Sequence, residues 1–241
     1  MAQYIYGKNV VSERIKSKKD IEQILLVDNF SDSKVLKLLS DNKLKITYID
    51  SKKADKLSNK GLHQGILAKV KSYEYRDYKS VEKIIKDKKD SIVLIADGIE
   101  DPHNFGAILR TCDAIGVDAV FVPKFGNAPL NDTVAKVSTG AIEHVRICQV
   151  TNLNRLIEDL KTIGYWLVGA EEDNSLDYRQ VDYKGKIALV VGSEGKGISK
   201  LVLKNCDFKV NLPMVGHVNS LNVSVATGIL LYQIHSQQNP L

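Results

Sequence analysis

From residue 91 onward, short apolar runs of strand type alternate with segments whose apolar residues recur at helical spacing. The runs that read as strands span residues 92–96, 117–122, 145–150, 165–170 and 187–191. A continuous run such as 187–191, without polar alternation, is typical of a strand that is buried on both faces. The alternation predicts an α/β fold with a mainly parallel sheet covered by helices.

Two glycine-marked turns near the C-terminus follow strand-type runs and lead into helices. The first contains Gly192, Gly195 and Gly197, which allow close backbone approach or a positive φ. In the second, Ser220 is a candidate N-cap of the last helix. Apolar residues then follow at helical spacing, at Leu221, Val225, Ile229 and Tyr232. Two such junctions predict a small-ligand cleft at the carboxyl ends of buried strands.

The first 72 residues read as a smaller α/β unit. Its expected elements are a helix at 9–15, a helix that Ser33 can cap, and strands at 24–27, 44–49 and 64–70. Residues 73–90 then change in composition and read as a linker that runs into an amphipathic helix.

The expected domains are therefore an N-terminal domain at 1–75, a linker with its helix at 76–90, and a main domain at 91–241. Residues 1–90 hold 21 Lys and Arg against 13 Asp and Glu, whereas the rest of the chain holds 13 against 16. The basic first part suggests a polyanion partner such as RNA. Because acidic residues are interleaved throughout, a solvated lysine-rich surface explains the charge equally well.

The 241-residue chain has no apolar run of the roughly 18 residues that a membrane span needs. Its first residues lack the apolar core of a signal peptide, so we expect a cytoplasmic protein without a membrane partner. Cys112, Cys148 and Cys206 lie far apart and form no CxxC pair, which favours reduced core thiols.

Several common catalytic motifs are absent. The segment GSEGKGIS at 192–199 is not a Walker A loop, because Lys196 precedes the last glycine, and it lacks the GxGxxG spacing of dinucleotide sites. No HExxH, CxxC or GxSxG motif occurs, so neither a metal site nor a hydrolytic elbow is expected. A nucleoside without a triphosphate is the expected ligand.

An unusual set of polar residues remains at the loop-to-helix junctions: Asn104, Arg110, Glu194, Ser220 and Asn222. Taken singly, each has a structural explanation that is at least as good as a functional one. Asn104 and Ser220 could be helix caps, and Asn222 could satisfy a helix N-terminus. Arg110 could pair with an acid such as Asp113, and Glu194 could accept backbone N–H bonds within its loop.

Three motifs around these residues resemble those of the SpoU (TrmH-like) RNA 2′-O-ribose methyltransferases. Residues 104–110, NFGAILR, resemble the first family motif, N-x-G-x-x-x-R. Residues 192–197, GSEGKG, resemble the second, G-x-E-G-x-G. Residues 212–216 and 220–226, LPMVG and SLNVSVA, resemble the third. The motifs occur in the family's order, which makes the combination specific.

The resemblance implies a SPOUT-type α/β sheet with a deep trefoil knot, an S-adenosyl-L-methionine cofactor and a homodimer. Residues 6–11 and 63–66 resemble parts of the small L30e-like domain that binds substrate in the group methylating guanosine in large-subunit (23S) ribosomal RNA. A methyl group would therefore pass to a ribose 2′-hydroxyl of ribosomal RNA. Alternatives are tRNA, an rRNA site whose methylation confers antibiotic resistance, or a catalytically silent RNA-binding protein of this fold.

The resemblance also assigns roles to residues. The cofactor-binding set would be Gly192, Leu212, Leu221, Val168, Gly169 and Ala170. Arg110 would take the proton, with Asn104, Glu194, Ser220 and Asn222 arranging the site. A guanidinium with a pKa above about 12 is a poor base. An RNA phosphate is therefore the other candidate acceptor, with Arg110 orienting it.

Overall fold

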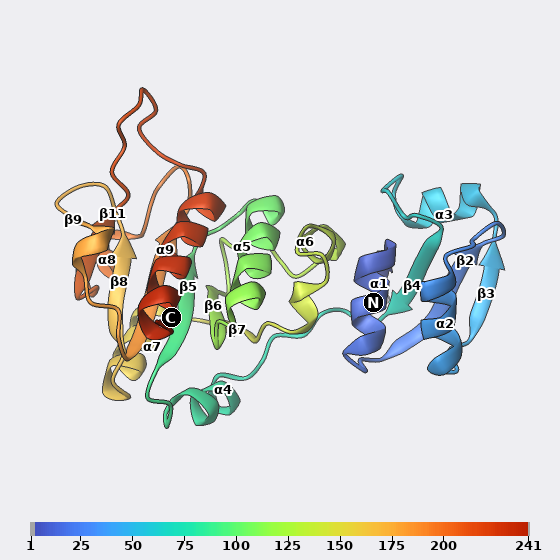
Figure 1. The fold of residues 1–241 in the computed structure, drawn as a ribbon, viewed down its shortest axis with the longest axis horizontal. Helices are drawn as coiled ribbons and strands as arrows, with labels where there is room; N and C mark the ends of the chain where they lie inside the picture. The colour runs from blue at the N-terminus through green and yellow to red at the C-terminus, as the bar shows by residue number, and fades with distance from the viewer. Residues whose placement is uncertain (1–2, 241) are drawn as a thin grey trace. The chain divides into compact units, whose positions relative to one another are not determined.

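The structure is a computed structural model that describes residues 3–240 (Figure 1). Two compact units are present. One comprises the described residues up to Glu74 together with Pro129–His144, and the other comprises Tyr75–Ala128 with the described residues from Val145 onward. The main domain expected at 91–241 thus contains a segment that groups with the N-terminal unit.

The N-terminal unit is built on a four-stranded sheet in the order β1-β4-β2-β3, antiparallel except for the pair β2–β3. Its elements are β1 (Gln3–Tyr6), α1 (Lys8–Lys16), β2 (Ile21–Val27), α2 (Ser33–Asp41), β3 (Ile46–Ile49), α3 (Ser51–Leu57) and β4 (Ile66–Val70). The expected Ser33 cap is wrong by one residue, because Asp32 accepts the N–H of Val35. The sequence missed β1 and α3. The latter buries only Ala54 and so shows no apolar period.

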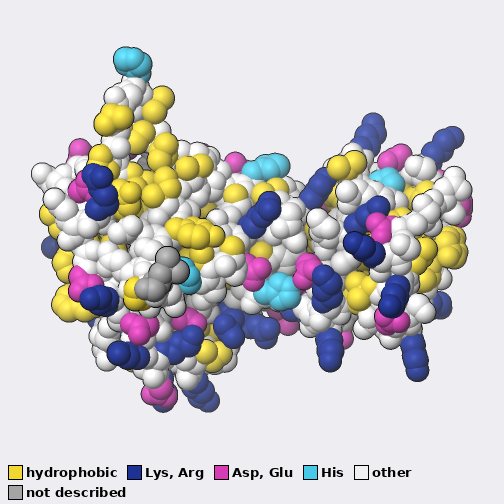
Figure 2. Space-filling model, in the orientation of Figure 1, with side chains coloured by type: hydrophobic (Ala, Val, Ile, Leu, Met, Phe, Trp, Pro, Cys, Tyr) yellow, Lys and Arg dark blue, Asp and Glu magenta, His cyan; other side chains and the backbone are white. Residues whose placement is uncertain are grey.

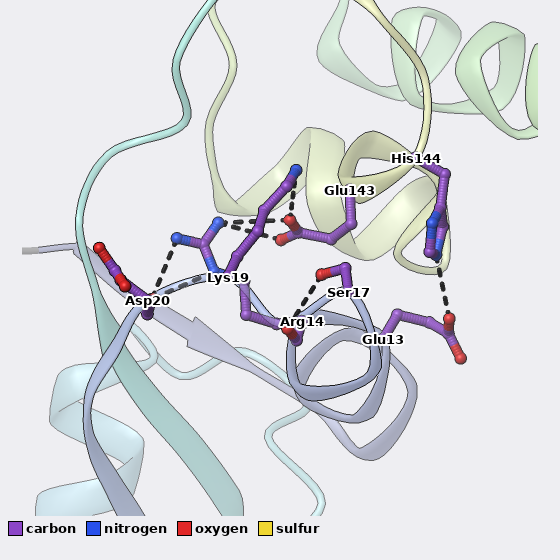
Figure 3. Close-up of polar contacts among 7 residues, drawn as sticks. All are labelled: Glu13, Arg14, Ser17, Lys19, Asp20, Glu143 and His144. Atoms are coloured by element: carbon purple, nitrogen blue, oxygen red, sulfur yellow. Dashed lines mark hydrogen bonds and ion pairs between the residues drawn. The ribbon is translucent and has the colours of Figure 1, made fainter.

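Residues 129–144 add α6 (Asp132–Val137) and the 3-10 turn η1 (Ala141–Glu143) to this unit. Figure 3 shows how an ion-pair network joins η1 to α1. Arg14 Nη1 donates to both carboxylate oxygens of Glu143 at 3.2 and 3.3 Å, and Lys19 Nζ lies 2.8 Å from Oε2. The Glu143 side chain is fully buried, so this carboxylate is neutralised inside the unit.

The larger unit contains a seven-stranded sheet in the order β7-β6-β5-β10-β8-β11-β9, and every pairing in it is parallel. Its strands are β5 (Ser91–Asp97), β6 (Ala119–Pro123), β7 (Ile147–Val150), β8 (Trp166–Ala170), β9 (Leu176–Asp177), β10 (Lys186–Gly192) and β11 (Phe208–Asn211). The predicted α/β fold with a parallel sheet is confirmed, while the trefoil knot stays a prediction. The sequence missed the two-residue strand β9, which lies within an acidic stretch that reads as loop.

Helices cover both faces of this sheet, as the uninterrupted apolar strands require. The helices are α4 (Tyr78–Ile85), α5 (Pro102–Ile115), α7 (Leu153–Thr162), α8 (Lys200–Lys204) and α9 (Val223–Gln238), with a 3-10 turn η2 (Tyr178–Gln180). Buried residues of α4, α7 and α8 pack with Val93 and Ile95 on one face. On the other face α5 and α9 lie side by side (Figure 1).

Both predicted caps of the functional helices are wrong. Asp101 caps α5, accepting the N–H of His103 at 2.9 Å, and Asn104 lies within the first turn. Asn222, not Ser220, caps α9 by accepting the N–H of Ser224 at 2.9 Å. The side chain of Asn104 is therefore available for another partner, which the next section identifies.

The three cysteines form no disulfide. Burial raises the pKa of the Cys148 and Cys206 thiols to about 12 and raises that of Cys112 as well. The thiols are accordingly protonated packing residues, in agreement with the sequence interpretation. Among residues 3–240, no helix is both long and apolar enough to cross a membrane.

Candidate active site at the carboxyl edge of the parallel sheet

The glycine turn after β10 brings backbone against backbone. A Cβ on Gly192 would lie 2.0 Å from the carbonyl carbon of Gly197, so only glycine fits at that position. Gly197 itself adopts φ +63, in the left-handed region that favours glycine. The turn is tied to the neighbouring strand, because Ser199 N donates to Asp97 Oδ2 at 2.8 Å. A Cβ on Gly195, in contrast, would meet nothing within 4 Å.

A pocket of about 570 Å³ opens where β8, β10 and β11 end and α9 begins. Its volume is in the range of about 300–1,000 Å³ that is usual for small-molecule and cofactor sites. Its lining comes from residues 170–173, 191–194, 196–197, 210–212, 214, 220–223, 226 and 230. The cleft expected at the carboxyl ends of the strands is therefore present.

Three side chains from the three motifs meet beside this pocket in a hydrogen-bonded cluster. Asn104 Nδ2 donates to Glu194 Oε1 at 2.7 Å. Asn222 Nδ2 donates to the same Oε1 at 2.9 Å and to Asn104 Oδ1 at 2.9 Å. We call Asn104, Glu194 and Asn222 the amide–carboxylate cluster. Residues 90 and 118 positions apart in the chain are thereby brought into contact.

The cluster leaves one oxygen of its carboxylate free. Both amide donors converge on Glu194 Oε1, and in the described part of the chain Oε2 has no hydrogen-bond partner. Glu194 is exposed and lines the pocket, whereas Asn104 is buried behind it. Asn222 Oδ1 meanwhile caps α9, so the same side chain fixes the helix start and the carboxylate. The arrangement presents an oriented acceptor to whatever occupies the pocket mouth.

Two of the predicted catalytic residues lie outside the cluster. Ser220 is exposed and lines the pocket, and in the described part of the chain it has no hydrogen bond to Glu194. Arg110 is exposed on α5 and is not part of the pocket lining. Among residues 3–240 it forms no hydrogen bond or ion pair, so the alternative of a surface pair with Asp113 is not observed.

Comparison with known proteins identifies the family of the chain. Residues 91–232 match the model described as SpoU rRNA Methylase family. Residues 4–76 match the model described as RNA 2′-O ribose methyltransferase substrate binding. The chain belongs to the SpoU methylase family.

A Staphylococcus saprophyticus protein named as a TrmH family tRNA/rRNA methyltransferase is 47% identical over 98% of this chain and 96% of its own length. An AdoMet-bound rRNA methyltransferase from Sinorhizobium meliloti covers 97% of this chain and 86% of its own, with a TM-score of 0.80 at 20% identity. The A. aeolicus TrmH/SpoU tRNA modifying enzyme covers 66% of this chain and 81% of its own, with a TM-score of 0.57 at 34% identity. This SpoU chain is thus an RNA 2′-O-ribose methyltransferase by family.

Four of the six residues expected at the SpoU cofactor site line the pocket, namely Ala170, Gly192, Leu212 and Leu221. Val168 and Gly169 are buried on β8, two residues and one residue before Ala170 respectively. A Cβ on Gly169 would approach Cys206 Sγ at 3.0 Å and Leu203 Cδ1 at 3.2 Å, so Gly169 lets α8 pack against the strand. Ala170, the last residue of β8, is therefore the first residue of this strand that lines the pocket.

Three acidic residues of the pocket were not singled out from the sequence. Glu171, Glu172 and Asp173 join Glu194 in the lining, against a single cation, Lys196. In the sequence, residues 171–182 read only as an acidic loop, and the signal that could have found these three residues is their position directly after a buried strand. Among residues 3–240, no group of three or more His, Cys, Asp or Glu is arranged to hold a metal ion.

Proposed function

We propose that this SpoU chain transfers a methyl group from S-adenosyl-L-methionine to the ribose 2′-hydroxyl of a guanosine in large-subunit (23S) ribosomal RNA. The observation that carries the proposal is the amide–carboxylate cluster, which joins all three motifs at the mouth of the pocket. The family match over 91–232 supports the reaction. The match of 4–76 to a substrate-binding domain supports an RNA substrate.

The pocket suits S-adenosyl-L-methionine. Four carboxylates against one ammonium group make its lining acidic, which favours a ligand that carries a sulfonium and an ammonium group. Main-chain groups around Gly192, Leu212 and Leu221 would hold the nucleoside, with Ala170 at the adenine side and Val168 and Gly169 supporting that strand end. The bound cofactor supplies an electrophilic methyl group, so the chain's task is alignment of the 2′-oxygen.

A matched pair of glycine variants tests the cofactor site. Gly192→Ala places a Cβ where only 2.0 Å is free, whereas Gly195→Ala meets open space. In calorimetric titration with S-adenosyl-L-methionine, we expect the wild type and Gly195→Ala to bind and Gly192→Ala not to bind. Wild-type protein that takes up no S-adenosyl-L-methionine would overturn the cofactor assignment and favour a silent RNA-binding protein.

The amide–carboxylate cluster and Arg110 are proposed to have different roles in the methyl transfer. Glu194 Oε2 and Ser220 would orient the ribose, while Arg110 would stabilise the forming alkoxide and orient the RNA phosphate that accepts the proton. Arg110→Lys keeps the charge but loses the planar, bidentate geometry. We expect this variant to bind S-adenosyl-L-methionine normally and to lose nearly all turnover. Near-normal methylation by Arg110→Lys would remove this residue from the mechanism.

We further propose a homodimer in which α9 is covered by a second copy of the chain. One face of α9 is buried in its own unit, yet Val225, Ile229 and Tyr232 on the opposite face are 49%, 37% and 54% exposed. Figure 2 shows further hydrophobic side chains gathered on the loop that projects between β11 and α9. A helix that is apolar all round is normally buried on all sides. A second copy would also bring another Arg110 to an active site.

Light scattering on purified protein tests the dimer. The measured mass of the wild-type protein should be twice the 26.8 kDa of one copy, and Ile229→Glu should lower the measured mass toward that of one copy. A wild-type monomer at micromolar concentration would contradict the assembly.

Ribosomal RNA is favoured over tRNA by the extent of the similarity. The solved rRNA methyltransferase covers 97% of this chain, N-terminal unit included, whereas the solved tRNA modifying enzyme covers 66%. Mapping of 2′-O-methyl groups in ribosomal RNA and tRNA, with and without the gene, tests the substrate. We expect one guanosine of large-subunit rRNA to lose its methyl group. A loss confined to tRNA would overturn the rRNA assignment, and a loss linked to drug sensitivity would favour a resistance site.

A further inference from the structure

Phe125 stands out among the aromatic residues of the larger unit, because its side chain is 81% exposed. It lies two residues beyond the end of β6, at the same carboxyl edge of the parallel sheet as the pocket. Along this edge the pocket lies at β8, β10 and β11, and the amide–carboxylate cluster lies at β10 and β5. The loop that carries Phe125 follows β6, the next strand in the order.

The Phe125 loop is held in place by backbone hydrogen bonds on both sides. Lys124 N donates to Val150 O at 2.9 Å, and Ala128 N donates to Ile99 O at 2.8 Å. Ile99 N in turn donates to Asn127 Oδ1 at 3.1 Å. The loop after β6 is thereby fastened to the loop after β5. The ring is exposed on an ordered support, which is what a recognition residue needs.

A cation accompanies the ring. Lys124 Nζ lies 5.6 Å from the Phe125 ring centroid, within the range of a cation–π contact. Among residues 3–240, Lys124 forms no ion pair, so its charge is not neutralised by a carboxylate. An exposed aromatic ring beside an uncompensated ammonium group is the combination with which proteins hold unpaired nucleotides: the base stacks and the phosphate meets the cation.

The distance along the sheet edge between the Phe125 loop and the amide–carboxylate cluster can be spanned by one nucleotide or by two adjoining nucleotides. Adjacent strands lie about 4.8 Å apart, so β6 is about 10 Å from β10, whose end carries Glu194. A ribose at the amide–carboxylate cluster would have its own base, or that of the adjoining nucleotide, within reach of the loop after β6. We propose that Phe125 is a positioning residue that stacks on an unpaired base of the RNA substrate, with Lys124 meeting a phosphate. This inference rests on the proposed function.

Steady-state kinetics with deproteinised large-subunit rRNA test the proposal. We expect Phe125→Ala to raise the KM for RNA about tenfold, because stacking on one base is worth about 1–3 kcal/mol. The kcat should stay within about twofold, and the Kd for S-adenosyl-L-methionine should not change, since the pocket does not include Phe125. Phe125→Trp should restore the KM, and Phe125→Leu, of similar size but without a π face, should not.

Trp166 provides the matched control. It is the first residue of β8, so it lies at the opposite edge of the same sheet, and it is 54% exposed. Trp166→Phe should leave the KM for RNA unchanged. Because Trp166 is the only tryptophan in the chain, the double variant Trp166→Phe/Phe125→Trp carries a single fluorescent reporter on the loop. We expect single-stranded oligouridine to quench it and a blunt RNA duplex to leave it unchanged.

An unchanged KM for Phe125→Ala would overturn the proposal, and so would an unquenched reporter in the presence of oligouridine. A shift of Phe125→Ala to another oligomeric state in light scattering would show that the ring contacts protein, which also overturns it. The reporter separates this proposal from the enzymatic one. Quenching by oligouridine in a chain that methylates no RNA would contradict the proposed function and leave Phe125 as an RNA contact.

Discussion

Two carboxylates, Glu143 in the N-terminal unit and Glu194 in the larger unit, each hold together segments that are far apart in the chain. Glu143 is fully buried and receives two cations, Arg14 and Lys19. Glu194 is exposed and receives two neutral amides, from Asn104 and Asn222. Two cations balance the charge of Glu143 inside its unit. In the described part of the chain no cation pairs with Glu194, and one of its oxygens is left without a hydrogen bond at the mouth of the pocket.

The difference separates a structural carboxylate from one that is available for chemistry. A buried ion pair has lost its hydration, so it is compatible with a stable fold only while both charged partners are present. A carboxylate held by amides is oriented without losing its charge, so it can still interact with a ligand. Removing a partner should therefore reduce stability at Glu143 and activity at Glu194. Each of the following variants tests one side of that comparison.

The largest effect is expected at the buried network. Arg14→Met leaves the fully buried Glu143 carboxylate with Lys19 alone, and removing one partner of a buried pair costs about 3–5 kcal/mol. Urea unfolding followed by circular dichroism measures this loss. The control is Lys16→Met, because Lys16 pairs with Glu13 at the surface and such pairs contribute at most about 1 kcal/mol.

The double variant Arg14→Met/Glu143→Leu distinguishes charge from packing. With both charges absent, no buried carboxylate is left without a partner, and most of the lost stability should return. If the double variant is as unstable as Arg14→Met, the network acts through side-chain packing and the comparison with Glu194 fails on its structural side.

The second largest effect is expected on the rate of methylation, at Glu194. Glu194→Gln preserves shape and an acceptor for the two amides but removes the charge that faces the pocket mouth. Methylation of rRNA should fall by about 100-fold, the usual consequence of losing one oriented electrostatic group. The free energy of unfolding should change by less than about 0.5 kcal/mol, as for other exposed positions. Glu171→Gln, another carboxylate of the same pocket, is the control and should retain more activity. A large loss of stability in Glu194→Gln would assign it a structural role like that of Glu143.

The sequence predicted the sheet and the meeting of Asn104, Glu194 and Asn222 better than it predicted local detail. Long apolar runs determine strands directly, whereas a helix start depends on which of several polar residues reaches an N–H. At α5 that residue is Asp101, and Asn104 turns to Glu194. The family motifs pointed to the cluster, but no spacing rule gives the hydrogen bond between residues 90 positions apart.

Helix α9 shows a second limit of sequence patterns. The sequence marked Val225, Ile229 and Tyr232 as an apolar stripe, and these residues are exposed, while Leu230, Leu231 and Ile234 are buried. Both faces of the helix are apolar, so periodicity does not decide which one faces the sheet. The Arg14–Glu143 network was not predicted either, because charges at positions 14 and 143 carry no local signal of contact.

The smallest effect tests whether Asn222 acts as a helix cap or as a cluster donor. Asn222→Asp keeps an oxygen for the N–H of Ser224, so the N-cap is preserved and α9 should start as before. The substitution removes the amide that donates to Glu194 and places a second carboxylate beside it. We expect methylation to fall about tenfold, because like charges about 4 Å apart repel by about 1 kcal/mol in bulk water and about 4 kcal/mol near a protein surface, enough to turn the Glu194 carboxylate out of its orientation. The fall should be larger at low salt, because screening weakens repulsion between exposed charges. Activity equal to wild type at low salt would mean that Asn222 serves the helix alone, and Glu194 would then be held by Asn104 only.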